Sequence, residues 1–167
     1  MTSNRTGSGG LTRSEVGALP LGRTRYVAGF LIAPDDDRVL LIRKTHPEWQ
    51  AGKLNGIGGK IDPGESPLEA MVREFKEEAG LVITGWQHFL TLNANPNGRV
   101  YFFRCFAPFG VLCKAKTQTD EWVGHWSIGD ATLPYRFDMI PNLRWILPLA
   151  AHQHDTYAPI NAVELSQ

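Results

Sequence analysis

The sequence predicts a single α+β domain in which helices pack on a mixed β-sheet. Several short strand-like runs are separated by turn signals, and two segments have the pattern of helices. The chain has 167 residues, which fits one domain, and shows neither an internal repeat nor a second domain. Residues 1–22 are rich in Gly, Ser, Thr and Arg, so we expect a flexible N-terminal arm followed by one domain over residues 23–167.

The first two strands are predicted on either side of a turn. Tyr26–Ala33 and Val39–Lys44 are strand-like, and Pro34–Asp37 between them contains turn-forming residues. Thr45–Lys53 is expected to be a loop. Leu54–Ile57 is a short strand candidate that leads into a glycine-rich turn.

Residues Ser66–Ala79 are the best-defined helix in the sequence. Ser66 is suited to cap it, Pro67 fits its first position, and Glu69 completes a Ser-x-x-Glu capping box. Gly80 suits the left-handed residue that ends a helix.

The second half of the chain continues with strands and one more helix. Leu81–Asn93 and Arg99–Phe106 are strand-like, and residues 95–98 between them have a strong turn pattern. Trp122–Ile128 is another predicted strand. The predicted helix Met139–Ala151 contains prolines, which place its start near residue 141 and should bend or end it at residue 148.

Composition limits the classes of partner. Lys+Arg and Asp+Glu both total 17, so no net charge attracts the chain to extended nucleic acid or to an anionic membrane. Cys105 and Cys113 do not form a disulfide framework. The first twenty residues lack the apolar region of a signal peptide, and no run approaches the roughly 18 apolar residues of a membrane span. We therefore expect a cytoplasmic protein.

The helix at 66–79 has two distinct faces at about 100° per residue. The apolar stripe, which is expected to pack on the sheet, contains Leu68, Met71, Val72, Phe75 and Ala79. Glu74, Glu77 and Glu78 fall on another side with Ala70 between them, and are expected to line an exposed groove.

These carboxylates suggest a metal site. Like charges at this spacing repel by a few tenths of a kcal/mol, and Mg²⁺ removes the repulsion because it takes carboxylate oxygens as ligands. A solvated acidic surface is the alternative. The preceding loop favours metal and anion binding, because Gly56, Gly58, Gly59 and Gly64 let its backbone approach a ligand, and a helix N-terminus follows.

This loop and helix resemble the Nudix box, G-x5-E-x7-R-E-U-x-E-E-x-G-U, at every defined position. The matching residues are Gly59, Glu65, Arg73, Glu74, Phe75, Glu77, Glu78, Gly80 and Leu81. The flanking strands extend the resemblance more loosely over Arg25–Ala151. The resemblance implies a Nudix-type α/β/α sandwich with a mixed β-sheet.

The resemblance also implies roles for individual residues. Glu74, Glu77, Glu78 and the carbonyl of Gly59 would bind Mg²⁺ or Mn²⁺, and a carboxylate would orient or deprotonate the attacking water. The family's structural ion pair would join Arg73 to Glu65, the two residues that hold the loop against the helix.

Within the family, Leu54–Lys60 is similar to the strand and loop of enzymes that hydrolyse oxidised purine nucleoside triphosphates. This similarity makes Asn55 a candidate for contacting the base. Thr119–Trp122 resembles a later loop of the same enzymes, so Glu121 is a fourth metal-binding or catalytic carboxylate, with a solvated loop acid as the alternative. Lys44 and Lys60 are candidate substrate-binding residues, and a solvated charge at the strand end is the alternative for Lys44.

Two features of the sequence depart from that subgroup. The resembling enzymes have Trp-Pro-Asp-Asp after a Met, whereas Ile140–Leu143 here reads Ile-Pro-Asn-Leu. Asn142 would therefore either bind the base or cap a helix. Pro96 stands where members acting on ADP-ribose often carry a proline, although a turn explains it equally well.

The expected function is Mg²⁺-dependent hydrolysis of nucleoside triphosphates to monophosphate and pyrophosphate, as in sanitising of the nucleotide pool. The expected partner is a small nucleotide, and the protein would be a monomer or homodimer. The alternatives are hydrolysis of ADP-ribose or another nucleoside-diphosphate conjugate, RNA decapping, which the balanced charge disfavours, and a non-catalytic Nudix-fold sensor.

Overall fold

One mixed β-sheet organises the chain in the computed structural model, which describes residues 24–94, 98–131, 138–152 and 159–164. The strands lie in the order β3-β2-β1-β5-β4-β7, and β6 pairs with β2. The strands are β1 (Arg25–Ala33), β2 (Arg38–Arg43), β3 (Leu54–Asn55), β4 (Gln87–Ala94), β5 (Gly98–Phe106), β6 (Trp122–Ser127) and β7 (Ile160–Glu164). The helices are α1 (Pro67–Ala79), α2 (Phe109–Leu112), α3 (Ile128–Ala131) and α4 (Leu143–Ala151), with short 3₁₀ turns at Pro34–Asp36 and Glu48–Gln50.

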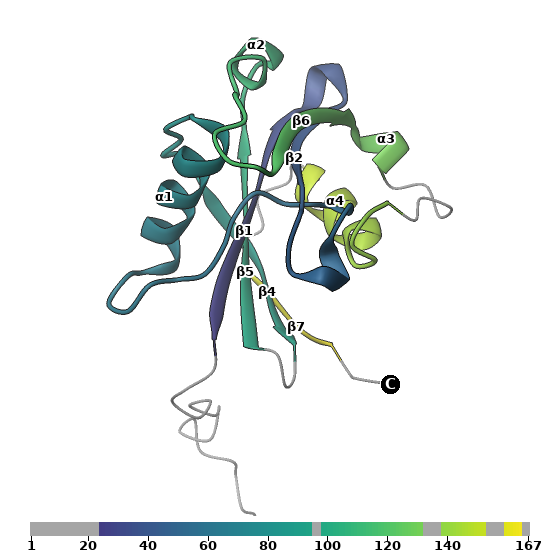
Figure 1. Cartoon of the computed structure of the whole chain (residues 1–167). Helices are drawn as coiled ribbons and strands as arrows, with labels where there is room; N and C mark the ends of the chain where they lie inside the picture. The colour runs from purple at the N-terminus through teal and green to yellow at the C-terminus, as the bar shows by residue number, and fades with distance from the viewer. Residues whose placement is uncertain (1–23, 95–97, 132–137, 153–158, 165–167) are drawn as a thin grey trace, which may run out of the picture.

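Helices cover both faces of the sheet. Figure 1 shows α1 on one side of the strands and α4 on the other. Successive side chains of a strand point to opposite faces, so β1 serves two cores: Val27 and Leu31 pack on the α1 side, and Phe30 and Ile32 on the α4 side. Because both faces are covered, β1 is a nearly continuous apolar run. The predicted α/β/α sandwich with a mixed sheet is confirmed.

The two edges of β1 have different partners. Along one edge β1 pairs in parallel with β5. Along the other edge it pairs with β2 only near Ile32 and Ala33. Further back, the glycine loop takes the place of a strand, with bridges from Gly29 to Ile57 and from Tyr26 to Lys60. The centre of the sheet therefore fixes the position of the loop.

Most predicted strands are present, with boundaries that differ by one or two residues. One prediction was too long: the strand proposed for Leu81–Asn93 begins only at Gln87, where pairing with Arg104 of β5 starts. Leu81 and Ile83 pack against the α1-side core without a strand partner. Strand β7, which pairs in parallel with β4, and the short helices α2 and α3 were not predicted.

Helix α1 begins and ends as predicted. The Ser66 hydroxyl accepts the N–H of Glu69, and the Glu69 carboxylate accepts the N–H of Ser66, which completes the capping box. Gly80 ends the helix at φ 68°. The helix and its caps are thus determined locally.

The buried face of α1 differs from the prediction. Leu68, placed in the apolar stripe, is 45% exposed, and Ala70, placed in the exposed acidic groove, is fully buried. The buried residues are Ala70, Met71, Phe75, Glu78 and Ala79. At about 100° per residue this arc runs from Ala70 to Ala79 with Glu78 near its middle. The helix is therefore turned so that an acidic side chain faces inward.

Helix α4 is shorter than the predicted Met139–Ala151. It begins at Leu143, two residues after Pro141, and Pro148, which was expected to bend or end it, lies inside the helix without ending it. Leu147 is buried and Leu149 is partly buried in the α4-side core, on either side of the missing N–H of Pro148, so packing outweighs the lost hydrogen bond. Among the described helices, none combines the length and the hydrophobicity that crossing a membrane would require.

The expectations for the N-terminal arm, for Pro96 and for residues 132–137 fall outside the described residues.

Candidate functional site

The glycine loop is held against β1 by backbone hydrogen bonds. Val27 donates its N–H to the carbonyl of Gly59 at 2.9 Å. Gly58 has φ 151°, and a Cβ there would lie 2.3 Å from the Val27 carbonyl oxygen, so only glycine fits. A Cβ on Gly59 would lie 2.6 Å from a carboxylate oxygen of Glu74. The loop backbone therefore touches both the central strand and the acidic face of α1.

Glu78 is the carboxylate of α1 that reaches furthest into the structure. It is nearly fully buried, and its Oε2 accepts the N–H of Gly58 at 3.0 Å. Burial raises the pKa of Glu78 to about 7, although the charge of Lys44 and the Gly58 hydrogen bond act in the opposite direction. This carboxylate therefore gains from any cation placed beside it.

Glu121 joins the site from the segment before β6. It is only 3% exposed, and its Oε1 accepts the N–H of Thr45 at 2.8 Å. Burial alone would raise the pKa of Glu121, but the hydrogen bonds from Lys44 and Thr45 outweigh it and the pKa is lowered. The alternative of a solvated loop acid was wrong for this side chain.

Lys44 links these two carboxylates. Its Nζ lies 3.5 Å from Oε1 of Glu78 and donates a hydrogen bond to Oε2 of Glu121. The Lys44 side chain is only 13% exposed, so the alternative of a solvated strand-end charge was wrong. The sequence pattern of β2 could have predicted this burial. Leu40 and Ile42 face the α1-side core, and Lys44, two positions later, continues the same face of the strand.

Arg73 contacts Glu74 and Glu77. Together with Glu78 and Glu121, these two glutamates are called the acidic cluster below. The predicted ion pair with Glu65 is confirmed by two hydrogen bonds of 2.9 Å, from Nε and Nη2. Arg73 also donates from Nη1 to Glu74 at 2.9 Å and to Glu77 at 3.1 Å, contacts that the sequence reading did not anticipate. The Arg73 hydrogen bonds lower the pKa of Glu65, whereas burial raises the pKa of Glu74 in spite of Arg73.

Two basic residues thus divide the four carboxylates into pairs. Arg73 holds Glu74 and Glu77, and the other pair surrounds Lys44. Among the described residues, no three His, Cys, Asp or Glu side chains are already gathered as metal ligands. The donor set nevertheless fits a hard divalent cation, because carboxylate oxygens and a carbonyl are the ligands that Mg²⁺ takes. The Gly59 carbonyl accepts one hydrogen bond and has a second lone pair.

Apart from Lys44, the predicted substrate-binding residues make no hydrogen bond to the four carboxylates in the described part of the chain. The Asn55 amide donates to Gln50 at 3.1 Å and accepts the N–H of Gly56 at 2.8 Å. Lys60 is exposed, and its carbonyl accepts a hydrogen bond from Arg73. Asn142 stands at the N-cap of α4, but its side chain makes no capping hydrogen bond.

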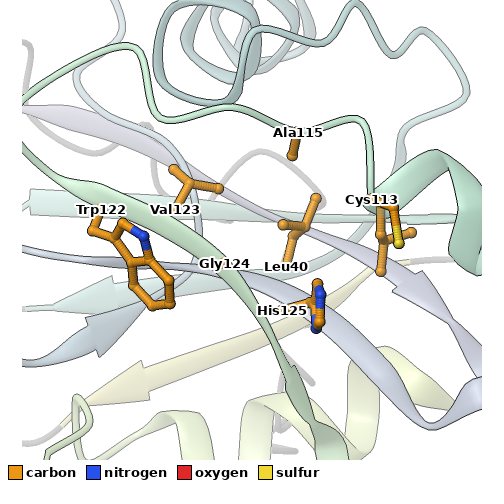
Figure 2. Close-up of a pocket in the computed structure, with 8 residues that line it drawn as sticks. Leu40, Cys113, Ala115, Trp122, Val123, Gly124 and His125 are labelled. Atoms are coloured by element: carbon orange, nitrogen blue, oxygen red, sulfur yellow. The ribbon is translucent and has the colours of Figure 1, made fainter.

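A separate cavity of about 320 Å³ lies between β6 and α2. Figure 2 shows Leu40 and Val123 between Trp122 and Cys113 in its wall. None of the four carboxylates is among its described lining residues. The cavity is therefore distinct from the acidic cluster, although Trp122 directly follows Glu121 in the chain.

Comparisons with known proteins agree with this geometry. The chain is 34% identical over 65 residues to a CTP pyrophosphohydrolase of Escherichia coli, covering 39% of this chain and 48% of that protein. It is 36% identical over 63 residues to an 8-oxo-dGTP diphosphatase of E. coli, covering 38% and 46%. The chain thus spans about half the length of these relatives.

A solved structure gives the same fold. The MutT NUDIX hydrolase of Burkholderia pseudomallei superposes with a TM-score of 0.61 at 20% identity, covering 77% of this chain and 98% of that one. Residues 22–146 match the family model described as the NUDIX domain. With the complete box on the loop and α1, and the same sandwich around it, the chain belongs to the Nudix family.

Proposed function

We propose that the protein is a pyrophosphohydrolase that uses Mg²⁺ or Mn²⁺ to cut nucleoside triphosphates into the monophosphate and pyrophosphate. The observation that carries the proposal is the convergence of Glu78 and Glu121 on one point beside the glycine loop. Two buried carboxylates from distant parts of the chain are costly; the single charge of Lys44 offsets part of that cost, and a divalent cation beside them would offset more.

In this proposal the acidic residues hold the metal and the attacking water. Glu74, Glu78 and Glu121, together with the Gly59 carbonyl, are the metal ligands, and the 56%-exposed side chain of Glu77 completes the set from the solvent side. A bound divalent cation makes water more acidic and neutralises charge on phosphate oxygens. One of these carboxylates would also orient the attacking water and accept its proton.

The arrangement of the chain also supports where the nucleoside would bind. Leu54 of β3 hydrogen-bonds to the backbone of residues 138 and 140, which brings Asn55 and the start of α4 into one neighbourhood. Ile140 and Leu143 are buried, so Asn142 is the polar residue of that run with a side chain able to meet a base. Lys44 and Lys60 supply positive charge for the phosphates.

The substrate class is supported by the relatives, whose names specify CTP and 8-oxo-dGTP. The residues after Met139 differ from those of the oxidised-purine enzymes that the sequence resembles, so we propose a nucleoside triphosphate without assigning the base. ADP-ribose and other nucleoside-diphosphate conjugates are the competing substrates.

The test is a screen of the purified protein with Mg²⁺ or Mn²⁺ against ribo- and deoxyribonucleoside triphosphates, oxidised purine nucleotides, ADP-ribose and nucleotide sugars. Products are separated by ion exchange and identified by mass. We expect monophosphate and pyrophosphate in equal amounts from a triphosphate. Preferred cleavage of ADP-ribose would show that the substrate is a nucleoside-diphosphate conjugate and not a triphosphate. Metal binding without turnover of any compound would favour a non-catalytic nucleotide sensor.

A further inference from the structure

The carboxylates on either side of Lys44 are each attached to the backbone by one oxygen. Oε2 of Glu78 accepts the N–H of Gly58, and Oε1 of Glu121 accepts the N–H of Thr45. The other oxygen of each carboxylate, Oε1 of Glu78 and Oε2 of Glu121, faces the ammonium of Lys44. Backbone amides thus fix the two acids, and the lysine contacts the oxygens that remain.

The lysine is the exchangeable member of this group. Its charge is carried on a flexible four-carbon stem, whereas both acids are buried and attached to the loop and to the strand end. Lys44 is separated from Glu78 by 34 residues and from Glu121 by 77, so its contact with them depends on the folded arrangement. If the ammonium moves outward, the two amide hydrogen bonds remain and the acids keep their positions.

We propose that Lys44 is a positioning residue that serves as a built-in counter-ion for Glu78 and Glu121 and is displaced when a divalent cation binds between them. The inference rests on the proposed function, because it assumes that these carboxylates bind metal. The ammonium keeps the acid pair stable before the cation arrives, and it competes with the cation for the same two oxygens. Lys44 therefore weakens metal binding while it stabilises the metal-free protein.

The main experiment measures Mn²⁺ binding by titration calorimetry without nucleotide. The variant is Lys44→Met, which keeps an unbranched side chain one atom shorter and removes its charge, and the matched control is Lys114→Met at an exposed lysine outside the site. We expect Lys44→Met to bind Mn²⁺ about tenfold more tightly, because a like charge no longer competes for the carboxylates. The control should bind as the wild type does.

Thermal unfolding supplies a second readout. Without metal, Lys44→Met should melt at a lower temperature than the wild type, because two buried carboxylates then lack a positive charge beside them. Saturating Mn²⁺ should raise its melting temperature by more than it raises that of the wild type, because stabilisation follows the affinity. A merely structural lysine would lower the melting temperature without tightening Mn²⁺ binding, and that result would overturn the inference.

A third measurement needs no variant. Amine acetylation of the wild-type protein, followed by peptide mass spectrometry, reports how accessible each lysine is. We expect Mg²⁺ to increase the acetylation of Lys44 and to leave that of Lys114 unchanged. Unchanged or slower acetylation of Lys44 would overturn the displacement.

The experiments distinguish failure of the proposed function from failure of the role proposed for Lys44. A wild-type protein that binds neither Mn²⁺ nor Mg²⁺ refutes the proposed function. A wild-type protein that binds metal, with Lys44→Met binding no more tightly, refutes only the role of Lys44.

Discussion

The carboxylate of Glu78 accepts the backbone N–H of Gly58 at 3.0 Å, which joins the middle of helix α1 directly to the glycine loop. The bond requires a helix turned with this acid toward the sheet and a loop residue that can adopt φ 151°. One hydrogen bond thus joins a helix residue of the Nudix box to the loop residue that directly precedes the box.

Glu78→Gln should separate catalysis from folding. The glutamine oxygen can still accept the Gly58 N–H, but the side chain no longer offers a negative charge to a metal. We expect kcat to fall at least about a hundredfold, whereas the melting temperature of the metal-free protein should stay equal or rise, because a buried charge with a raised pKa is removed. Steady-state kinetics and calorimetry measure the two effects.

The matched control for that substitution is Glu48→Gln, at an exposed glutamate outside the acidic cluster. It should leave both the rate and the melting temperature unchanged. Near-wild-type turnover of Glu78→Gln would remove this residue from the metal ligands.

Gly58→Ala tests the loop. The methyl group of an alanine here would lie 2.3 Å from the Val27 carbonyl oxygen, and the backbone conformation at Gly58 is one that residues with side chains rarely adopt. Strain of this kind costs about 1–3 kcal/mol before the clash is counted, so we expect a destabilisation of at least about 2 kcal/mol and loss of activity. Denaturant unfolding gives the free energy of unfolding.

Gly110→Ala in α2 is the control for the loop substitution, because an added Cβ there meets nothing within 4 Å. Its free energy of unfolding should be unchanged or slightly higher, since alanine favours helix more than glycine does. Equal effects of the two alanines would show that φ and the close approach at Gly58 do not matter.

The observed orientation of α1 predicts that truncating Met71 and truncating Leu68 reduce the free energy of unfolding by very different amounts. Met71→Ala should destabilise the protein by about 2–5 kcal/mol, because Met71 is fully buried against Gly29 of β1. Leu68→Ala should change the free energy of unfolding by no more than about 0.5 kcal/mol, because Leu68 is 45% exposed. Urea unfolding of both variants tests this, and a larger loss for Leu68→Ala would restore the apolar stripe read from the sequence.

The sequence predicted the features that are determined by neighbouring residues. The capping box of Ser66 and Glu69, the end of α1 at Gly80 and the pair of Arg73 with Glu65 all depend on residues within one short segment. The complete box identified the family for the same reason. Roles of the individual site residues stay predictions that the experiments above address.

The features that the sequence did not predict depend on distant partners. The rotation of α1 is set by where β1 and the loop lie, so counting residues along the helix placed Leu68 on the wrong face. The burial of Lys44 depends on acids 34 and 77 residues away. Strand β7 forms by pairing with β4, for example between Leu90 and Ile160, and its own residues have little strand pattern.

His88 provides a test of pH dependence away from the metal site. Burial lowers the pKa of His88 from its usual 6.5, although a hydrogen bond with the Leu90 carbonyl acts in the opposite direction. Its Nε2 also contacts the Thr91 hydroxyl at 2.9 Å. The unfolded chain therefore takes up a proton at this histidine at a higher pH than the folded protein does.

The sign of the effect follows from that difference. The contribution of His88 to stability is present above its unfolded pKa and is lost as the pH falls through about 6.5 toward the folded pKa. Glu78, with a pKa of about 7, contributes with the opposite sign over an overlapping pH range, so the pH dependence of the wild-type melting temperature alone does not isolate the histidine.

The useful quantity is the difference in melting temperature between the wild type and His88→Gln, which replaces the ring with a neutral side chain that does not titrate. We expect the melting temperature of the wild type to fall relative to that of His88→Gln between about pH 7.5 and about pH 5.5. A difference that stays constant across this range would mean that His88 takes up its proton equally well in the folded and the unfolded protein.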